Sequence, residues 1–445
     1  MSTAGTEIYN HSIYFEPSKC HGEMACLRAC PVEAIRVRGG RAKMLEDKCI
    51  DCGECVKVCT SGAIIPRTNT FKDFSSFKYT VAIPSLALYS QFERNVRPKT
   101  ILTSLKKLGF DEVVDSTRAC VAVFKSLEKY IKNHRGRKPL ISSFCPTCIK
   151  LIQIRYPELL GSIVPIISPM ELAAREAKKE VSARLGINKN DIGVIYITPC
   201  PSKMILISQE EDSYYSDFDG AIPISDIYNT LFASLNQTLK TNGKEIEYFD
   251  ISGFGLNFGR LGGIVSVLEG ENYLSVGGLN DVTHILEEIE RGKLQDIDFV
   301  EMNACPEGCV GGSMTVDNIY LARSKMTYLI NFYGEKKLPV GKKDIYGESD
   351  LFYKSMYEPL PSKPLDVDLK KAITKISERK DILSRLPGID CGACGSPSCI
   401  TFAEDVVQGE ARINDCLFMF NDELKHKLKH KMLEVLELQR KMEDK

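Results

Sequence analysis

The sequence carries almost no net charge, because 58 Lys and Arg residues balance 59 Asp and Glu residues. Proteins that bind nucleic acids or anionic lipids usually carry a basic patch, so this balance predicts neither partner. The sequence also lacks an apolar run near the roughly 20 residues that a membrane-spanning helix needs. Its first residues, MSTAGTEIYNHS, have no signal-peptide core. We therefore expect a cytoplasmic protein without a membrane contact.

Cysteine, in contrast, is abundant, with 17 residues in a chain of 445. At roughly 150 residues per domain, this length predicts about three domains. Clustered CxxC spacings in a long intracellular chain indicate metal sites rather than disulfides. Fifteen of the cysteines fall into groups at 20–59, 145–309 and 391–416. Cys120 and Cys148 remain outside these ligand groups, and we expect both to be structural thiols.

The most informative group draws its cysteines from three distant segments, SSFCPTC, ITPCPSK and EMNACPEGCVGG. Its members are Cys145, Cys200, Cys305 and Cys309. Thiolates are soft ligands suited to iron–sulfur clusters. Ligands from three separate places predict a cluster inside a folded domain rather than one wrapped by a single loop.

These segments resemble the three signature motifs of the FeFe (iron-only) hydrogenases. In that family the four cysteines hold a 4Fe–4S cube, and the last one bridges to a two-iron centre that carries CO and cyanide. Cube and two-iron centre together form the H-cluster. The resemblance implies that Cys309 is the bridging ligand and that Lys203 hydrogen-bonds a cyanide, which makes these two the expected catalytic residues.

Two further segments extend the resemblance over the central part of the chain. VAIPSLAL (81–88) is similar to the strand-end loop near the two-iron centre, and SGFGLNFGRLGG (252–263) is similar to the glycine-rich loop beside it. Thr198 and Asn303 fall where the family has two methionines that flank the centre. The expected cofactor-contacting residues are Pro84, Ser85, Thr198, Pro199, Lys203, Phe258 and Asn303. The glycine run is spaced GxGxxxG, which argues against a dinucleotide-binding loop.

The chain departs from the family where catalytic members carry their proton relay. The relay thiol before the first cube cysteine is replaced by Phe144, and the relay serine falls on Val164. The two relay glutamates fall near Phe124 and Leu127, with Glu128 as the nearest carboxylate. Loss of a positioned general acid lowers a rate by on the order of 10²–10⁴-fold. We therefore expect the usual proton route to be closed.

The N-terminal segment resembles a two-cluster bacterial ferredoxin. Its second half, CIDCGECVKVC, is complete, and a 4Fe–4S cube is expected on Cys30, Cys49, Cys52 and Cys55. In the first half Glu23 stands where the family has a cysteine, which leaves Cys20, Cys26 and Cys59. A 3Fe–4S cluster, a cube completed by the Glu23 carboxylate or water, and an empty site all remain open. We favour an altered cluster.

The C-terminal segment LPGIDCGACGSPSC, followed by a distant cysteine, resembles a small 4Fe–4S domain. The expected ligands are Cys391, Cys394, Cys399 and Cys416. The spacing alone would also permit zinc. Beyond it, 421–445 reads as a charged helix capped by Asn421 or Asp422, with an apolar stripe that would suit a homodimer or a signalling partner. The stripe consists of Leu428, Met432, Val435 and Met442.

Alternation of expected strands and helices predicts the fold class of the central part. Strands are expected at 79–84, 139–144, 193–199 and 298–303, and helices at 117–133, 168–184 and 281–291. The resemblance implies an α/β hydrogenase domain (77–360), in which two lobes with parallel sheets surround a buried H-cluster. It is flanked by an α+β ferredoxin domain (1–76), a small helical 4Fe–4S domain (361–420) and the charged helix 421–445.

The resemblance predicts an H2-activating protein of low turnover, of the sensory or regulatory type. Its partners would be H2, protons and a redox protein such as a ferredoxin. One alternative is a fully working hydrogenase with another proton route, through Cys148 or Glu128. The other is a non-enzymatic iron–sulfur assembly or carrier protein without the two-iron centre. Lys203, Phe258 and the Pro84–Ser85 loop argue against the latter, since an empty pocket needs no cyanide donors.

Overall fold

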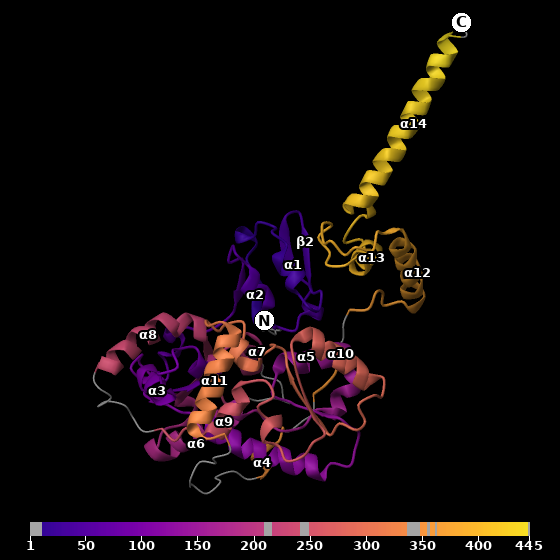
Figure 1. Ribbon diagram of the computed structural model, residues 1–445. Helices are drawn as coiled ribbons and strands as arrows, with labels where there is room; N and C mark the ends of the chain where they lie inside the picture. The colour runs from indigo at the N-terminus through magenta and orange to yellow at the C-terminus, as the bar shows by residue number, and fades with distance from the viewer. Residues whose placement is uncertain are drawn as a thin grey trace, which may run out of the picture. The chain divides into compact units, whose positions relative to one another are not determined.

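The computed structural model describes residues 11–208, 216–240, 249–335, 348–353, 357–360 and 363–443. The chain forms two compact units, each built from several segments (Figure 1). The first, called the central unit here, comprises 1–14, 50–53 and 66–361. The second, called the two-ended unit because it draws on both ends of the chain, comprises 15–49, 54–65 and 362–445.

The central unit contains a four-stranded parallel sheet in the order β6-β5-β8-β9. Every residue of β8 is buried, and so are the last four of β5. Strands buried on both faces are typical of parallel sheets covered by helices on each side. The strands expected at 79–84 and 193–199 are therefore confirmed to within one residue. The bounds are β5 (Tyr79–Pro84), β6 (Glu112–Val113), β8 (Ile192–Thr198) and β9 (Gly220–Pro223).

A second parallel sheet has the order β10-β11-β7, with β10 (Tyr273–Gly277), β11 (Phe299–Asn303) and β7 (Leu140–Ile141). The strand expected at 298–303 is confirmed, while the one at 139–144 is shorter than expected. β7, β8 and β11 each end shortly before one of the cysteine segments. Because active sites of parallel sheets lie at the carboxyl ends of strands, this arrangement gathers the cysteines between the two sheets.

Helices cover these sheets at the positions that the sequence pattern predicted. The helices expected at 117–133, 168–184 and 281–291 appear as α4, α6 and α10. At the start of α6, Ser168 accepts a hydrogen bond from the backbone N–H of Glu171, and Pro169 occupies the first turn. The helices of the central unit are α3 (Pro98–Lys106), α4 (Thr117–Asn133), α5 (Pro146–Arg155), α6 (Pro169–Leu185), α7 (Ser202–Ser208), α8 (Ile224–Lys240), α9 (Gly253–Leu256), α10 (Leu279–Glu290) and α11 (Ile319–Tyr333).

In the two-ended unit, segments from both ends of the chain pack together. An antiparallel hairpin of β2 and β3 carries Arg36, which forms a 2.6 Å ion pair with Asp405 of α13. Next to it, the backbone N–H of Val37 donates to the carbonyl of Gly395. The elements are α1 (Ala25–Ala29), β2 (Ile35–Arg38), β3 (Arg41–Met44), α2 (Glu54–Val58), α12 (Leu369–Arg385) and α13 (Cys399–Val407). The strands β1 (Ile13–Phe15) and β4 (Ile64–Pro66) each include residues of both units.

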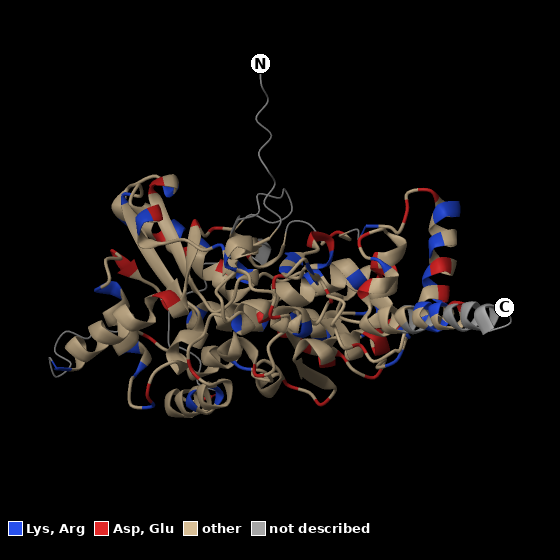
Figure 2. Cartoon of the chain, turned by 90° about the horizontal axis from the view of Figure 1, so that it is seen from above, with Lys and Arg blue, Asp and Glu red and all other residues tan. Residues whose placement is uncertain are grey.

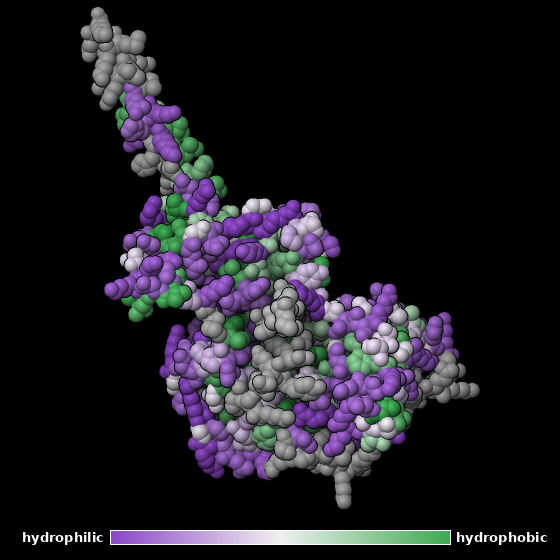
Figure 3. All heavy atoms as spheres, turned by 180° about the vertical axis from the view of Figure 1, so that it is seen from behind, coloured by the Kyte–Doolittle hydropathy of each residue, from purple (hydrophilic) through white to green (hydrophobic). Residues whose placement is uncertain are grey.

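The last helix, α14 (Leu417–Glu443), begins earlier than the sequence pattern predicted. Asn421 and Asp422 lie inside it, so the prediction that one of them caps the helix is wrong. Leu428 and Met432 of the expected stripe are 56% and 65% exposed, and Figure 3 shows apolar atoms along the described part of the helix. The side chains of Val435 and Met442 lie outside the described residues.

Basic and acidic residues both occur along the described elements, as Figure 2 shows. No helix among the described residues combines the length and the apolar character required to cross a bilayer.

Candidate metal centre and cofactor pocket

Four cysteines of the central unit lie at strand and helix ends that face one another. Cys145 follows β7 and immediately precedes α5, while Cys200 follows β8. Cys305 follows β11, and Cys309 lies in the short helix η9 (Gly308–Gly311). The backbone N–H of Ala304 approaches the Sγ of Cys145 at 3.5 Å, which joins the first segment to the third. The structure therefore brings the expected cube ligands into one region.

The protonation behaviour of these thiols suits a metal site. Burial raises the pKa of Cys200 to about 12, so a thiolate there needs a nearby cation. A hydrogen bond from the thiol of Cys148 lowers the pKa of Cys145 to about 6. Iron supplies the missing cation, because a coordinated thiol loses its proton outright. The donor set therefore fits an iron–sulfur cube.

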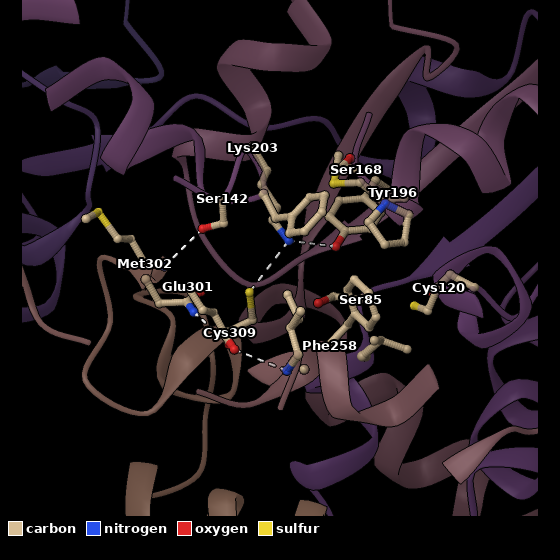
Figure 4. Close-up of a pocket in the computed structure, with 18 residues that line it drawn as sticks. Ser85, Cys120, Ser142, Ser168, Tyr196, Lys203, Phe258, Glu301, Met302 and Cys309 are labelled. Atoms are coloured by element: carbon tan, nitrogen blue, oxygen red, sulfur yellow. Dashed lines mark hydrogen bonds between the residues drawn. The ribbon is translucent and has the colours of Figure 1, made fainter. Parts of the chain in front are cut away.

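A cavity beside Cys309 forms the candidate cofactor pocket (Figure 4). Lys203, near the start of α7, points its ammonium into it, with Nζ 3.8 Å from the Sγ of Cys309 and 3.2 Å from the hydroxyl of Tyr196. Burial opposes the charge on Lys203, but the neighbouring Cys309 and Tyr196 raise its pKa well above the usual range. The pocket thus holds a buried hydrogen-bond donor with a positive charge beside the expected bridging cysteine.

The expected cofactor-contacting residues divide into two sets. Those that line the cavity are Ser85, Lys203, Phe258 and Asn303, together with Cys309. Those that do not line it are Pro84, Thr198 and Pro199. The hydroxyl of Thr198 instead donates to the carbonyl of Cys200 at 2.8 Å. It therefore shapes the cysteine loop rather than the cavity wall.

Apolar side chains occupy the positions where the family carries its proton relay. Phe144 lines the cavity and packs against Phe258, with ring centroids 5.8 Å apart. Val164 and Leu127 are fully buried. Glu128 does not line the cavity and pairs with Lys132 at 3.2 Å. No carboxylate takes the place of the relay on this side of the cavity, as far as the described residues extend.

Glu301 of β11 is a buried carboxylate in the cavity wall that the sequence analysis missed. It accepts hydrogen bonds from the backbone N–H groups of Gly262, Ile264 and Val265, each at 3.1 Å. Burial nevertheless raises its pKa to about 7. Glu301 therefore holds the glycine-rich loop that carries Phe258. The motif EMNAC contains this glutamate, but nothing in the local pattern identifies its partners.

The same loop also packs closely against the segment of Cys309. Gly308 has a φ of 78°, which an L side chain rarely adopts. A Cβ at this position would lie 2.6 Å from the backbone nitrogen of Leu261. A side chain there would push the loop away from the bridging cysteine.

Tyr196 of β8 is a second pocket residue that the sequence analysis missed. It is 3% exposed, and its ring packs against Phe218 at 5.2 Å. Since β8 is buried on both faces, period-two alternation gives no signal for the side chain that faces the pocket. Cys120 and Ser142 also line the cavity, which the sequence analysis did not predict.

In the two-ended unit, Cys20, Cys26 and Cys59 line one cavity together with Glu23. The Glu23 carboxylate accepts a hydrogen bond from the hydroxyl of Thr60. This places a carboxylate beside three thiols, an arrangement that is compatible with a cube completed by Glu23 and leaves the other two outcomes open.

Of the other ferredoxin-type cysteines, Cys30 and Cys49 lie close to Cys55, whose pKa is raised chiefly by burial and further by these two neighbours. Cys52 belongs to the segment 50–53, which is part of the central unit. There its carbonyl accepts a hydrogen bond from Ser313 at 3.2 Å.

The four C-terminal cysteines also line a single cavity. The loop that holds Cys391 turns through two left-handed residues, Asp390 and Gly392. The carboxylate of Asp390 accepts the backbone N–H of Cys399 at 2.6 Å, which ties the loop to the start of α13. Cys391 is exposed, unlike the other 16 cysteines of the chain.

Sequence profiles of three families match the chain. Residues 78–272 and 265–313 match the C-terminal domain of the iron-only hydrogenase large subunit, which covers more than half of the chain. Residues 12–60 match a 4Fe-4S dicluster domain, and residues 386–418 match an Fe-S cluster family. These matches support the expected fold class, 4Fe–4S clusters and an H-cluster.

Individual relatives are remote. The NADP-reducing hydrogenase subunit HndD of Solidesulfovibrio fructosivorans is 23% identical over 59% of this chain and 55% of its own length. Iron hydrogenase 1 of Clostridium pasteurianum is 23% identical over 48% of this chain and 44% of its own. The cytosolic Fe-S cluster assembly factor nar1 of Aspergillus oryzae is 29% identical over 21% of this chain and 16% of its own. The chain thus spans about half the length of the first two.

Solved structures of [FeFe]-hydrogenases are among those that align with the chain. One that describes oxygen inactivation of the H cluster aligns with 66% of this chain and 97% of its own, at 16% identity and a TM-score of 0.44.

Proposed function

The chain belongs to the iron-only hydrogenase large-subunit family, and from this premise we propose that it activates H2 at low turnover in a sensory or regulatory role. The observation that carries the proposal is the buried ammonium of Lys203, directed at Cys309 inside a pocket bounded by Ser85 and Phe258. A buried charge is expensive unless it has a partner. A cyanide-bearing centre beside Cys309 would supply one.

The proposed roles of the residues follow from their positions. Cys145, Cys200, Cys305 and Cys309 would hold the cube. Lys203 would donate to a diatomic ligand, while Phe258 and Phe144 exclude water from the cavity. When bound, the H-cluster supplies an iron site for heterolytic H2 cleavage and an outlet for electrons.

Low turnover is proposed because the polar proton relay of the family is replaced by apolar side chains. Phe144 can neither donate nor accept a proton, and it lies in the cavity wall. Without a positioned acid, proton exchange at the cofactor is expected to be slower by on the order of 10²–10⁴-fold. Such a site would report the presence of H2 through its redox state rather than process it rapidly.

Infrared spectroscopy of the anaerobically matured chain tests the proposal most directly. We expect CO and cyanide bands under argon that change under H2 and under CO. Iron is counted on the same sample. Fully assembled cubes without such bands would contradict both the low-turnover sensory function and the alternative of a fully working hydrogenase.

A Phe144→Cys variant tests the closed proton route. Restoring a thiol at this position should raise the rate of H2 evolution. An unchanged rate would favour the working hydrogenase with a substitute route through Cys148 or Glu128. Of these two, Cys148 lies next to Cys145, whereas Glu128 is paired with Lys132.

The second candidate function is iron–sulfur assembly or transfer, which the similarity to the assembly factor nar1 favours. In that case the cube would form and the pocket beside Lys203 would stay without a two-iron centre. The infrared spectrum separates the two functions, since only the first predicts cyanide bands.

The remaining proposals concern partners and setting. Electrons would reach or leave the chain through its flanking clusters, with a ferredoxin-like protein as redox partner. We further propose a signalling partner or a homodimer, a cytoplasmic location and an altered cluster beside Glu23. The four-part division at 76, 360 and 420 remains a proposal about function, distinct from the two compact units.

A further inference from the structure

Three polar side chains meet at one corner of the cofactor pocket, and each comes from a different element. Tyr196 lies in β8, Lys203 near the start of α7, and Ser85 directly before the short helix η4 (Leu86–Ser90). All three are buried, with exposures of 3%, 8% and 3%. The phenol of Tyr196 accepts a hydrogen bond from Lys203 at 3.2 Å (Figure 4). It accepts another from the hydroxyl of Ser85.

The hydrogen-bonding capacity of Lys203 determines where its ammonium can point. Its contacts with Tyr196 and with the Sγ of Cys309 engage two of the three ammonium protons. The third proton is left for a group inside the cavity, which Lys203 lines. The Nζ atom also lies 5.4 Å from the centroid of the Tyr196 ring, which adds an attraction between the cation and the aromatic ring.

Ser85 makes a second contact with the phenol. Its Oγ accepts the backbone N–H of Ala87 at 3.3 Å, and its hydroxyl donates to Tyr196. Two donors from different elements, Lys203 and Ser85, therefore fix the phenol oxygen.

The position of Tyr196 is itself fixed. Its strand pairs with β5 so that Tyr196 lies opposite Ile83, two residues before Ser85. The ring packs on Phe218, which is 4% exposed. A rigid ring with a single hydroxyl therefore holds both donors in place.

We propose that Tyr196 is a positioning residue that orients Lys203 as a hydrogen-bond donor to the anionic diatomic ligands of the cofactor. The inference rests on the proposed function, because it names the partner of the oriented protons. It assigns no proton transfer to the phenol. Tyr196 acts through its neighbours.

A Tyr196→Phe variant removes the hydroxyl and keeps the ring. Its infrared spectrum should show shifted and broadened cyanide bands after maturation, because the ammonium gains freedom. Tyr89→Phe is the matched control: Tyr89 is equally buried, its hydroxyl bonds Asp115 at 2.6 Å, and it does not line the cavity. The control should keep the bands of the unsubstituted chain. Unchanged bands in Tyr196→Phe would overturn the inference.

A second measurement uses the chain without the two-iron centre. Tyr196→Phe should lower Tm by about 2–4 °C, since a buried ammonium loses a partner. In a Lys203→Met background the same substitution should have a smaller effect. Equal effects in both backgrounds would mean that the two side chains are not coupled, and would contradict the inference.

The two measurements also separate the inference from the proposed function. If the unsubstituted chain lacks CO and cyanide bands, the proposed function fails, and with it the role of the oriented protons. If the bands are present and Tyr196→Phe leaves them in place, only the inference fails.

Discussion

At the scale of single residues, the sequence identifies ligands better than it identifies the groups around them. The fifteen proposed ligand cysteines follow from spacing and resemblance. The four C-terminal ones line one cavity, the three beside Glu23 line another, and Cys309 lines the cofactor pocket. Tyr196 and Glu301 could not be found in this way. Their partners lie in other elements, and a strand buried on both faces gives no pattern that tells one side from the other.

Cys148 offers a prediction at this scale. Its thiol hydrogen-bonds the proposed ligand Cys145, and hydrogen bonds to ligand sulfurs favour the reduced state of a cluster. We expect Cys148→Ala to lower the midpoint potential of the cube by about 30–60 mV, at 59 mV per tenfold in the reduction equilibrium. Spectroscopic redox titration of the assembled cube measures this midpoint potential.

Two further variants control this measurement. Cys148→Ser keeps a donor and should restore most of the potential. Cys120→Ala removes an equally buried thiol on α4 and should leave the midpoint potential of the cube unchanged. A potential that shifts equally in Cys148→Ala and Cys120→Ala would contradict the prediction.

At the scale of elements, the strands and helices of the central unit were predictable, but their attachments to loops were not. The strands expected at 79–84 and 193–199 agree with β5 and β8, because a long apolar run predicts a buried strand. The strand expected at 139–144 is limited to β7, because only Leu140 and Ile141 pair with β11. The start of α14 was misplaced, because Leu417 and Phe418 extend the helix ahead of its polar stretch.

The attachment of the glycine-rich loop to β11 through Glu301 predicts a dependence of stability on pH. The pKa of Glu301 is raised from 4.5 to about 7, so the folded chain binds a proton between these values that the unfolded chain releases. The contribution of this group to stability is therefore complete below pH 4.5 and is lost as pH rises through about 7. Its size is roughly 2–4 kcal/mol.

Thermal unfolding at several pH values tests this contribution. In Glu301→Gln the fall in stability between pH 5 and pH 8 should be smaller than in the unsubstituted chain. Glu128→Gln, at the surface, provides the control and should retain the full slope. Identical slopes in all three chains would show that Glu301 does not titrate in this range.

The contact between the β2–β3 hairpin and α13 supports another prediction. Arg36 and Asp405 are 5% and 7% exposed, and Asp405 also accepts from Ser396 at 2.6 Å. Removing one partner of a buried pair leaves an uncompensated charge. Asp405→Ala should therefore lower the free energy of unfolding of the two-ended unit by about 3–5 kcal/mol.

The neighbouring pair Lys48–Glu404 serves as a control, because it links the same region at 3.0 Å but is partly exposed. Glu404→Ala should cost about 1 kcal/mol or less. Urea unfolding with iron content as a second probe measures both variants. Equal losses of unfolding free energy in Asp405→Ala and Glu404→Ala would mean that burial of the Arg36–Asp405 pair adds nothing to stability.

At the scale of the whole molecule, the sequence predicts the families present but not how the chain is divided between compact units. The ferredoxin-like cysteines and the C-terminal cysteines look like separate modules in the sequence. In space, 15–49, 54–65 and 362–445 form one unit, and 50–53 belongs to the other. Contacts between residues 369 positions apart, such as Arg36 and Asp405, leave no local pattern in the sequence.

Exposure of the cysteines predicts the order in which clusters are lost. Cys391 is exposed, whereas Cys145, Cys200, Cys305 and Cys309 are at least half-buried. A chelator should therefore remove the C-terminal cluster first, by attack at the iron bound to Cys391. Iron content followed over time, with Cys391→Ala to identify that cluster, checks the order. Prior loss of the cube in the central unit would contradict it.

The pairing of Arg36 with Asp405 also has a consequence for biosynthesis. Arg36 and Asp405 are 369 positions apart in the chain, so a ribosome releases the hairpin long before α13, and Arg36 stays without this partner until α13 has emerged. The central unit can close while the chain is still attached. The two-ended unit closes only after its late segment has been made, which couples the loading of its cluster sites to the synthesis of α13.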